Sequence, residues 1–254
     1  MNIIITGASG GVGAALAKAY AAPGVTLGLC GRDSVRLEQL AEACRKSGAG
    51  VNCILADVAD KERMNSVLND FDKQHPVDLV IANAGVSAGT GGMVGETEEQ
   101  ARRLFAVNLE GVLNTIYPLM PHMRRRGRGQ IAIMSSLAGL RGMPGAPAYS
   151  ASKGAVRLFG EALRTELSRD GIAVSVICPG FIKTPMTAVN PFPMPFLMEA
   201  DSAAARIKRD LDRKKARIAF PWPLYAFLWI LGLFPQDWGN WLMSRLPAKP
   251  PARQ

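Results

Sequence analysis

Residues 6–13 read TGASGGVG, a turn with glycine at half of its positions. An apolar run at residues 2–6 predicts a buried strand before the turn, and residues 14–20 predict a helix after it. Glycines at such a turn adopt unusual backbone angles and let a phosphate approach the helix N-terminus, where free N–H groups favour an anion. The glycines are not spaced as GxGxxG, but a glycine-rich turn directly after the first strand predicts a dinucleotide-binding site.

Apolar runs and amphipathic segments alternate from this turn to residue 177. The runs predict strands at residues 25–30, 51–55, 77–82, 129–134 and 172–177. The segments between them predict helices at residues 34–47, 60–74, 97–117 and 149–169. The predicted fold is therefore α/β: a Rossmann-like, doubly wound parallel sheet of about seven strands, with helices on both faces and further C-terminal helices. Ligands of such sheets bind at the carboxyl ends of the strands.

The chain of 254 residues suits one large α/β domain and is short for two. We expect residues 1–190 to form the dinucleotide-binding and catalytic region. Residues 191–254 are expected to add a substrate lid, a last strand at 217–220 and apolar, aromatic helices to the same domain. A hydrophobic content of 48% with 20% charged residues excludes global disorder.

The net charge of +9 is unevenly distributed along the chain. Residues 124–128 hold four arginines, and residues 206–217 hold seven basic side chains. Such a balance suits nucleic acid, anionic lipid or a phosphorylated ligand. Aromatic residues do not alternate with basic ones near the arginine cluster, so we expect no nucleic-acid partner.

The four cysteines, Cys30, Cys44, Cys53 and Cys178, show no CxxC spacing, and three lie in apolar surroundings. They indicate reduced thiols in a cytoplasmic protein, with neither a disulfide framework nor a metal site. The N-terminal residues have neither a basic leader nor a long apolar region, so no signal peptide is expected.

The second predicted strand ends at Gly31, Arg32 and Asp33, where the adenosine ribose of a dinucleotide would lie. A carboxylate at the strand end would bond the ribose hydroxyls, whereas an arginine just after it would pair with a 2′-phosphate. Glycine occupies the strand end and Arg32 follows, which favours NADP(H) over NAD(H). Asp33 keeps NAD(H) open, and Arg32 as a solvated loop charge is the alternative.

Two further strand ends carry polar or small residues. Asp57 could bond the adenine amino group, or it could cap the helix that starts near Asp60. Asn83-Ala84-Gly85 would let the backbone approach a flat ligand, with Asn83 holding the turn. The glycine-rich residues 85–95 are expected to rim the site and to become ordered on binding.

Tyr149 and Lys153 are four residues apart, so on a helix their side chains share one face. An ammonium beside a phenol makes the phenol easier to deprotonate, so Tyr149 is a candidate general acid/base. Ser135 and Ser136 follow the strand at 129–134. Chance proximity on an amphipathic helix is the alternative for Tyr149 and Lys153.

Asn108 lies in the middle of an apolar helix face, where asparagine is disfavoured unless its amide has partners. It could satisfy a helix bulge or a bound water, or it could take part in a catalytic water relay.

These motifs, in this order, resemble the short-chain dehydrogenase/reductase family, in its single-domain branch, over about residues 1–190. The resemblance implies that Tyr149 exchanges a proton with the substrate oxygen and that Lys153 lowers the pKa of Tyr149 and binds the nicotinamide ribose. It also implies that Ser136, by its spacing from Tyr149, holds the substrate oxygen and that Asn108 steadies a water behind Lys153.

The same resemblance implies a cofactor-binding surface and a reaction. The reaction is reversible hydride transfer between NAD(P)(H) and the carbonyl or alcohol carbon of a small molecule, in a homodimer or homotetramer. The implied cofactor contacts are Gly7, Ser9, Gly11, Val12, Gly13, Arg32, Asp57, Val58, Asn83, Ala84, Gly85, Tyr149, Lys153, Pro179, Gly180, Ile182 and Thr184.

Two other functions use the same fold. A cofactor-binding regulator or scaffold would not need Asn108, Ser136, Tyr149 and Lys153 together. A sugar-nucleotide epimerase would use the same tyrosine and lysine but needs a larger C-terminal substrate domain.

The tail departs from the family pattern, because we find no glycine-containing last strand of the kind that closes a tetramer. Residues 218–236 carry no charge, and all four tryptophans lie at 222–241. The helical part, about 224–234, is too short to span a bilayer of roughly 30 Å. The tail is a substrate lid, a subunit interface or an in-plane membrane contact through residues 206–245 at the inner face of the membrane. The last case would fit a lipophilic substrate such as a sterol, an acyl chain or a cell-envelope precursor.

Overall fold

The computed structural model describes residues 1–87, 96–190, 192–235 and 237–238. Most of the predicted glycine-rich rim at 85–95 lies outside the described residues. The end of the apolar tail, including Trp241, lies outside them as well.

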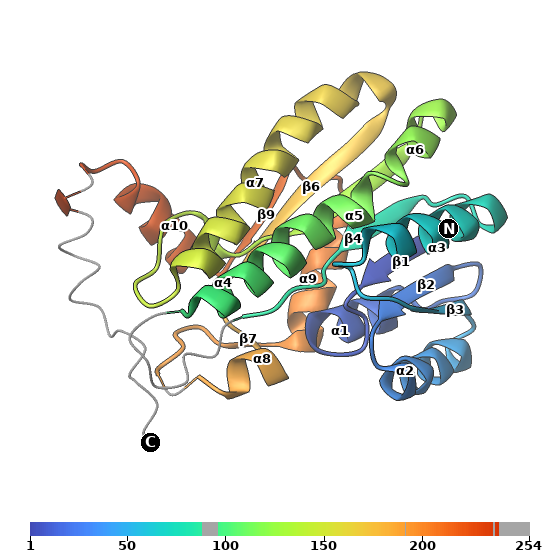
Figure 1. Ribbon diagram of the computed structural model, residues 1–254, viewed down its shortest axis with the longest axis horizontal. Helices are drawn as coiled ribbons and strands as arrows, with labels where there is room; N and C mark the ends of the chain where they lie inside the picture. The colour runs from blue at the N-terminus through green and yellow to red at the C-terminus, as the bar shows by residue number, and fades with distance from the viewer. Residues whose placement is uncertain (88–95, 191, 236, 239–254) are drawn as a thin grey trace.

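A seven-stranded parallel sheet, in the order β3-β2-β1-β4-β5-β6-β9, forms the centre of the described part of the chain (Figure 1). Its strands are β1 (Asn2–Thr6), β2 (Thr26–Gly31), β3 (Gly50–Leu55), β4 (Leu79–Ala82), β5 (Gly129–Met134), β6 (Ile172–Pro179) and β9 (Arg217–Phe220). Ile3, Ile4 and Ile5 of β1 are all fully buried, because a central parallel strand is covered on both faces. The doubly wound fold is confirmed, and residues 217–220 form the seventh strand.

Helices cover both faces of this sheet (Figure 1). The apolar side chains of α1 (Gly11–Tyr20), α2 (Ser34–Lys46) and α9 (Ala200–Asp212) form the core on one face. The other face is covered by α3 (Lys61–Gln74), α5 (Gly111–Ile116), α6 (Met120–Arg126) and α7 (Pro147–Leu167), with α4 (Glu98–Phe105) packed against α7. The strand order reverses between β1 and β4, and the crevice at that point is where ligands of such sheets bind.

The predicted helix at 97–117 forms, with a change of hydrogen-bond pattern in its middle. α4 and α5 are joined by a π-helical turn, η1 (Ala106–Glu110), with Asn108 at its centre. Such turns insert an extra residue into a helix and occur frequently at functional sites. A helical periodicity in the sequence does not reveal them, because the flanking turns keep helical angles.

The structure rejects one interpretation of Asp57. The cap of α3 is Asp60, whose side chain accepts a hydrogen bond from the backbone N–H of Arg63 at 2.9 Å. Asp57 instead accepts from the backbone N–H of Ala59 at 3.0 Å and pairs with Arg32. The carboxylate nearest the first turn of the helix takes the capping position, and Asp57 stays at the end of the sheet.

The C-terminal region adds short elements beside the carboxyl ends of the strands. They are β7 (Ile182–Lys183) paired with β8 (Met198–Glu199), α8 (Pro185–Ala188) and α10 (Trp222–Leu231). Leu228 of α10 packs on Leu137, Val176 and Cys178, so one side of this apolar helix is buried on the sheet and on η2 (Leu137–Gly139). Among the described residues, no helix combines the length and apolarity that crossing a membrane requires.

Candidate active site

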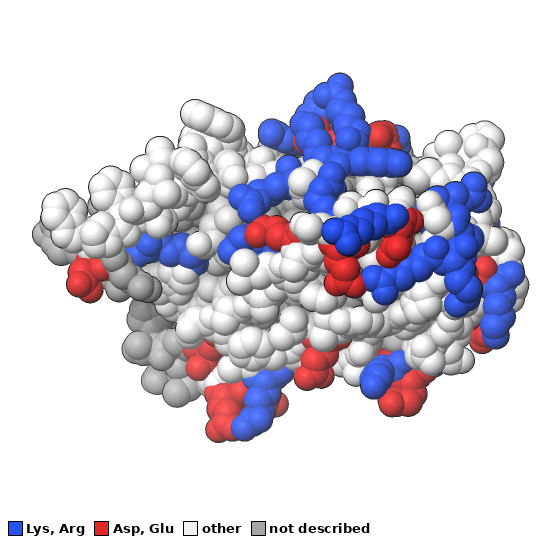
Figure 2. Space-filling view, turned by 90° about the horizontal axis from the view of Figure 1, so that it is seen from above, with Lys and Arg blue, Asp and Glu red and all other residues white. Residues whose placement is uncertain are grey.

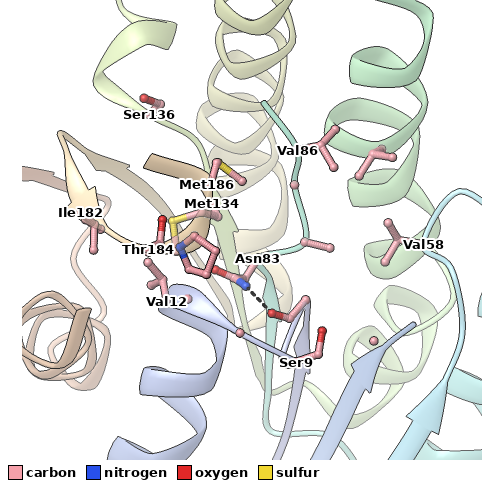
Figure 3. Close-up of a pocket in the computed structure, with 18 of the residues that line it drawn as sticks. Ser9, Val12, Val58, Asn83, Val86, Met134, Ser136, Ile182, Thr184 and Met186 are labelled. Atoms are coloured by element: carbon pink, nitrogen blue, oxygen red, sulfur yellow. Dashed lines mark hydrogen bonds between the residues drawn. The ribbon is translucent and has the colours of Figure 1, made fainter. Parts of the chain in front are cut away.

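A cavity of about 350 Å³ lies at the carboxyl ends of the strands (Figure 3). It brings together the predicted residues from the glycine turn, the ends of β2 and β4, β5, α7 and the segment after β6. All of the predicted site residues line it except Gly13 and Asn108. The lining also includes Gly10, Gly31, Arg36, Ala56, Val86, Val107, Met134, Ser135, Pro185, Met186 and Thr187.

The glycine turn is held against the end of β4. Gly7 has φ +66°, and a Cβ atom there would lie 2.8 Å from the Cα of Ala84. Asn83 donates through Nδ2 to the carbonyl of Thr6 at 2.9 Å and more weakly to that of Gly7 at 3.4 Å (Figure 3). A side chain at Gly13 would collide with the Gly7 carbonyl, so Gly13 shapes the turn from behind instead of lining the cavity.

The N-terminus of α1 opens onto this end of the cavity. Gly10 precedes the helix and supplies no side-chain hydrogen bond to it. The backbone N–H groups of the first turn are therefore available to a ligand. Free N–H groups and the helix dipole together make a site suited to a phosphate.

Two arginines lie at the end of β2. Arg32 pairs with Asp57 at 3.3 Å, and both side chains are more than one-third exposed. Asp33 accepts from the backbone N–H of Arg36 at 3.0 Å and so caps α2, and it also pairs with the Arg36 guanidinium at 3.3 Å. The Asp33 carboxylate therefore already has partners within the protein. Arg36 is not among the predicted cofactor contacts, although its place in the first turn of the helix that follows Arg32 is a signal that could have indicated it.

Tyr149, Lys153 and Ser136 meet at the other end of the cavity. Tyr149 lies in the first turn of α7, and the ammonium of Lys153 is 6.0 Å from the centre of its ring. Lys153 is 4% exposed and donates to the carbonyl of Met134 at 2.9 Å. The side chain of Ser136 lies beside the phenol of Tyr149 and lowers the pKa of that phenol. A phenol, a hydroxyl and an ammonium thus line the same cavity as Met134 and Met186.

The pKa values of this group are governed first by burial. Burial raises the pKa of Tyr149, and the neighbouring Ser136 hydroxyl offsets part of that rise. Burial lowers the pKa of Lys153 to about 8, against a smaller opposite effect of Cys178. The pKa of Tyr149 therefore shifts in the opposite direction to the one expected from the sequence. The reason is that desolvation is the largest influence on the phenol, whereas the ammonium of Lys153 bonds the Met134 carbonyl.

The two neighbouring serines have different partners. The hydroxyl of Ser135 is buried and donates to the carbonyl of Lys153 at 2.7 Å, which fixes α7 against β5. Ser136 accepts from the backbone N–H of Ala138 at 3.1 Å and faces the phenol of Tyr149. Only the second serine therefore has its hydroxyl beside that phenol, in agreement with its spacing in the sequence.

Asn108 lies behind the cavity lining and is fully buried. Its amide accepts from the backbone N–H of Val86 at 2.8 Å and donates to the Val86 carbonyl at 3.0 Å and to the Ser152 hydroxyl at 3.2 Å. It thus joins the π turn to the segment after β4 and to α7. The partners of the amide are Val86 and Ser152, so the expectation that it satisfies the helix bulge itself is wrong. The water relay stays a prediction.

Known proteins resemble this chain in sequence. Residues 1–191 match the short chain dehydrogenase family. An uncharacterized oxidoreductase of Myxococcus xanthus is 38% identical over 222 residues, which cover 87% of this chain and 87% of the relative.

Solved structures resemble the chain over most of its length. A short-chain dehydrogenase from Sphingobium yanoikuyae, in complex with NADPH, has a TM-score of 0.81 and 28% identity, with 97% of this chain and 96% of that one covered. A 3-oxoacyl-[acyl-carrier protein] reductase from Brucella melitensis, with bound NAD, has a TM-score of 0.73 and 28% identity, with coverage of 86% and 88%. The chain belongs to the short-chain dehydrogenase family of oxidoreductases.

Proposed function

We propose that this protein interconverts a carbonyl and an alcohol with NADP(H), and that Tyr149 is the general acid/base. The observation that carries the proposal is the arrangement at the two ends of one cavity. The phenol of Tyr149 meets Ser136 at one end, and the glycine turn with Arg32 lies at the other. A dinucleotide bound between them would bring its nicotinamide toward the phenol.

A bound nicotinamide cofactor would supply the hydride in reduction and accept it in oxidation. During reduction Tyr149 donates its proton to the carbonyl oxygen as the carbon gains the hydride, and oxidation reverses both transfers. Ser136 holds that oxygen by a hydrogen bond. Lys153, whose pKa is about 8, is mostly protonated at neutral pH and stabilises the phenolate that forms. Asn108 fixes the segment after β4 behind Lys153.

The preference for NADP(H) rests on the charges at the end of β2. Arg32 and Arg36 line the cavity there, and Gly31 offers no carboxylate at the strand end. Asp33 caps α2 and pairs with Arg36, so it is a poor ribose ligand. The NADPH complex of the Sphingobium relative supports this assignment, whereas the Brucella relative holds NAD.

We further propose that the substrate is lipophilic and that residues 191–254 belong to the same domain as its lid and apolar wall. A Cβ atom at Gly180 would lie 2.8 Å from Pro221 and 3.5 Å from Leu224, so the start of α10 borders the Ser136 end of the cavity. The 3-oxoacyl reductase activity in the name of the Brucella relative supports an acyl ketone as the first class to test.

The exposed side of α10 is the basis for the proposed in-plane membrane contact. Trp222, Trp229 and Ile230 are each at least half exposed, and Figure 2 shows a surface of uncharged residues around the helix. Aromatic side chains of this kind favour the interface between lipid and water. Flotation with anionic vesicles measures the contact, and a protein that stays at the bottom of the gradient contradicts it.

A homodimer or homotetramer is proposed from the surface of α5 and α7. Tyr117 and Leu158 are more than half exposed there, and the ring of Tyr117 packs 6.2 Å from that of Phe159. Light scattering after gel filtration tests this, and a monomer at all concentrations excludes it.

A turnover screen tests the proposed function. NADPH absorbance is followed with ketones, aldehydes, quinones and acyl ketones of increasing chain length. We expect reduction that improves with apolar length, because burial of apolar area contributes about 0.8 kcal/mol per CH₂ group. Binding of NADPH without any turnover would instead support the alternative of a cofactor-binding regulator.

The epimerase alternative loses support, since β9 joins the same sheet and no separate substrate domain is present among the described residues.

A further inference from the structure

Glu96 is the residue that holds the N-terminus of the helix carrying Tyr149. Its carboxylate accepts two backbone hydrogen bonds, one from the N–H of Ala148 at 2.5 Å and one from the N–H of Tyr149 itself at 3.1 Å. Glu96 is more than fifty residues away in the sequence, beside α4. It is half-buried and does not line the cavity.

The first turn of α7 has two N–H groups that need such a partner. Ala146, at the cap position, gives the helix no side-chain hydrogen bond, and Pro147 has no N–H. The N–H of Ser150 already bonds the carbonyl of Ala146 at 3.0 Å. The N–H groups of Ala148 and Tyr149 therefore remain, and the two carboxylate oxygens of Glu96 take one each.

The backbone of Glu96 is held in place by the start of another helix. The next residue, Thr97, caps α4 through a capping box: its hydroxyl accepts from the N–H of Gln100, and the Gln100 side chain accepts from the N–H of Thr97. α4 in turn packs against α7. A negative charge at a helix N-terminus is favourable, and hydrogen bonds to a carboxylate are stronger than neutral ones.

We propose that Glu96 is a positioning residue, which fixes the start of α7 so that the phenol of Tyr149 stays against Ser136. The terminal turn of a helix frays readily when its N–H groups lack partners. Tyr149 lies in that turn, whereas the glycine turn and Arg32 are on other elements. Loss of Glu96 should therefore slow the chemical step and leave cofactor affinity almost unchanged. This inference rests on the proposed role of Tyr149 as acid/base.

The variants Glu96→Gln and Glu96→Ala test it. Glu96→Gln keeps one acceptor oxygen, so kcat should fall by about 10-fold. Glu96→Ala keeps neither, so kcat should fall by about 100-fold, the loss expected when a catalytic group is displaced by roughly 1 Å. The dissociation constant for NADPH should change by less than about twofold. Hydrogen exchange of the Tyr149 amide should speed up in the same order. Glu96→Asp keeps the carboxylate on a shorter side chain, so its kcat should be higher than that of Glu96→Ala.

Asp60→Ala is the matched control. It removes a carboxylate that also accepts a backbone N–H at the start of a helix, but on α3, and Asp60 does not line the cavity. It should lower the melting temperature to a similar extent and leave kcat within about twofold.

Three results would overturn the inference. They are a Glu96→Ala enzyme with full kcat, an equal loss of kcat in Asp60→Ala, and an unchanged exchange rate at Tyr149. A different result would contradict the proposed function, namely turnover by Tyr149→Phe at the wild-type rate. In that event the exchange rate at Tyr149 still shows whether Glu96 holds the helix.

Discussion

The two ends of the cavity are built in different ways. At the cofactor end, the glycine turn and the strand ends of β1, β2 and β4 are close in sequence or adjacent in the sheet, and the N-terminus of α1 has no side-chain cap. At the substrate end, Ser136, Tyr149, Gly180 and Pro221 come from four separate elements. The shape of the cofactor end depends on backbone conformation. The shape of the substrate end depends on side chains that come together when segments far apart in the sequence pack.

This difference leads us to expect different consequences of substitution. A change at the cofactor end should disturb folding and dinucleotide affinity together, because the turn belongs to the central sheet. A change at the substrate end should alter turnover while the sheet and the cofactor affinity persist.

The largest expected effect is that of Tyr149→Phe. Loss of the phenol should lower kcat by about 10²–10⁴-fold, the usual contribution of a general acid/base. The dissociation constant for NADPH, measured by titration, should stay within about twofold. Tyr117→Phe, at a half-exposed tyrosine outside the cavity, is the matched control and should keep full activity. Turnover by Tyr149→Phe at the wild-type rate would contradict the proposed role of Tyr149 as general acid/base.

Gly7→Ala should instead damage the fold and the cofactor site together. Gly7 has φ +66°, and a new Cβ atom would lie 2.8 Å from the backbone of Ala84. We expect a loss of about 2–4 kcal/mol in the free energy of unfolding, from backbone strain and the collision together. Gly127→Ala has the same sign of φ with no neighbour within 4 Å, so it measures the strain alone. Equal losses in both variants would show that the contact with Ala84 has no cost.

Arg32→Ala should affect the affinity for NADPH much more than the affinity for NADH. Removing a charge-assisted bond to a 2′-phosphate should weaken NADPH by about 10- to 100-fold, with a much smaller effect on NADH. Arg36→Ala should act in the same direction. Arg45→Ala breaks an exposed ion pair with Glu38 on the same helix as Arg36, away from the cavity, and should leave both affinities unchanged. Equal weakening of NADPH and NADH by Arg32→Ala would mean that Arg32 does not contact the phosphate.

The smallest expected effect is the dependence of stability on pH at Lys153. Its pKa is about 8 in the folded protein and 10.5 when unperturbed, so between these values the unfolded chain holds a proton that the folded protein has released. The destabilisation from the buried ammonium is complete below pH 8 and fades as the pH rises toward 10.5.

Lys153→Met removes that buried ammonium and keeps the other titrating groups. The variant should be the more stable protein at neutral pH, and its advantage in the free energy of unfolding should shrink by about 1 kcal/mol between about pH 7 and pH 9. Urea unfolding of both proteins at each pH measures the difference. An advantage that grows with pH would contradict the direction of the pKa shift.

Much of the cofactor end could be predicted from the sequence. The turn at residues 6–13 follows a strand directly, and the carboxyl ends of parallel strands meet at one edge, so Gly7, Asn83 and Arg32 could be expected to face one cavity. The spacing of Tyr149 and Lys153 on one helix face was predictable for the same reason, since it depends only on helical geometry.

The sequence did not reveal the contacts that depend on packing between distant segments. The π turn at Asn108, the capping role of Asp60 in place of Asp57, and the hydrogen bonds from α7 to Glu96 each join groups whose partners no local pattern identifies. The direction of the Tyr149 pKa shift is of the same kind, because it follows from the desolvation of the phenol by the segments packed around it.

The sequence by itself determined the order of strands and helices and the residue types at the strand ends, because periodicity and glycine spacing act over a few residues. The tertiary structure alone decided which elements adjoin the Tyr149 end of the cavity. There α10 packs over the segment after β5, and Glu96 reaches the start of α7. Those contacts form only when segments far apart in the chain are packed together, and they shape the end of the cavity where we expect the substrate to bind.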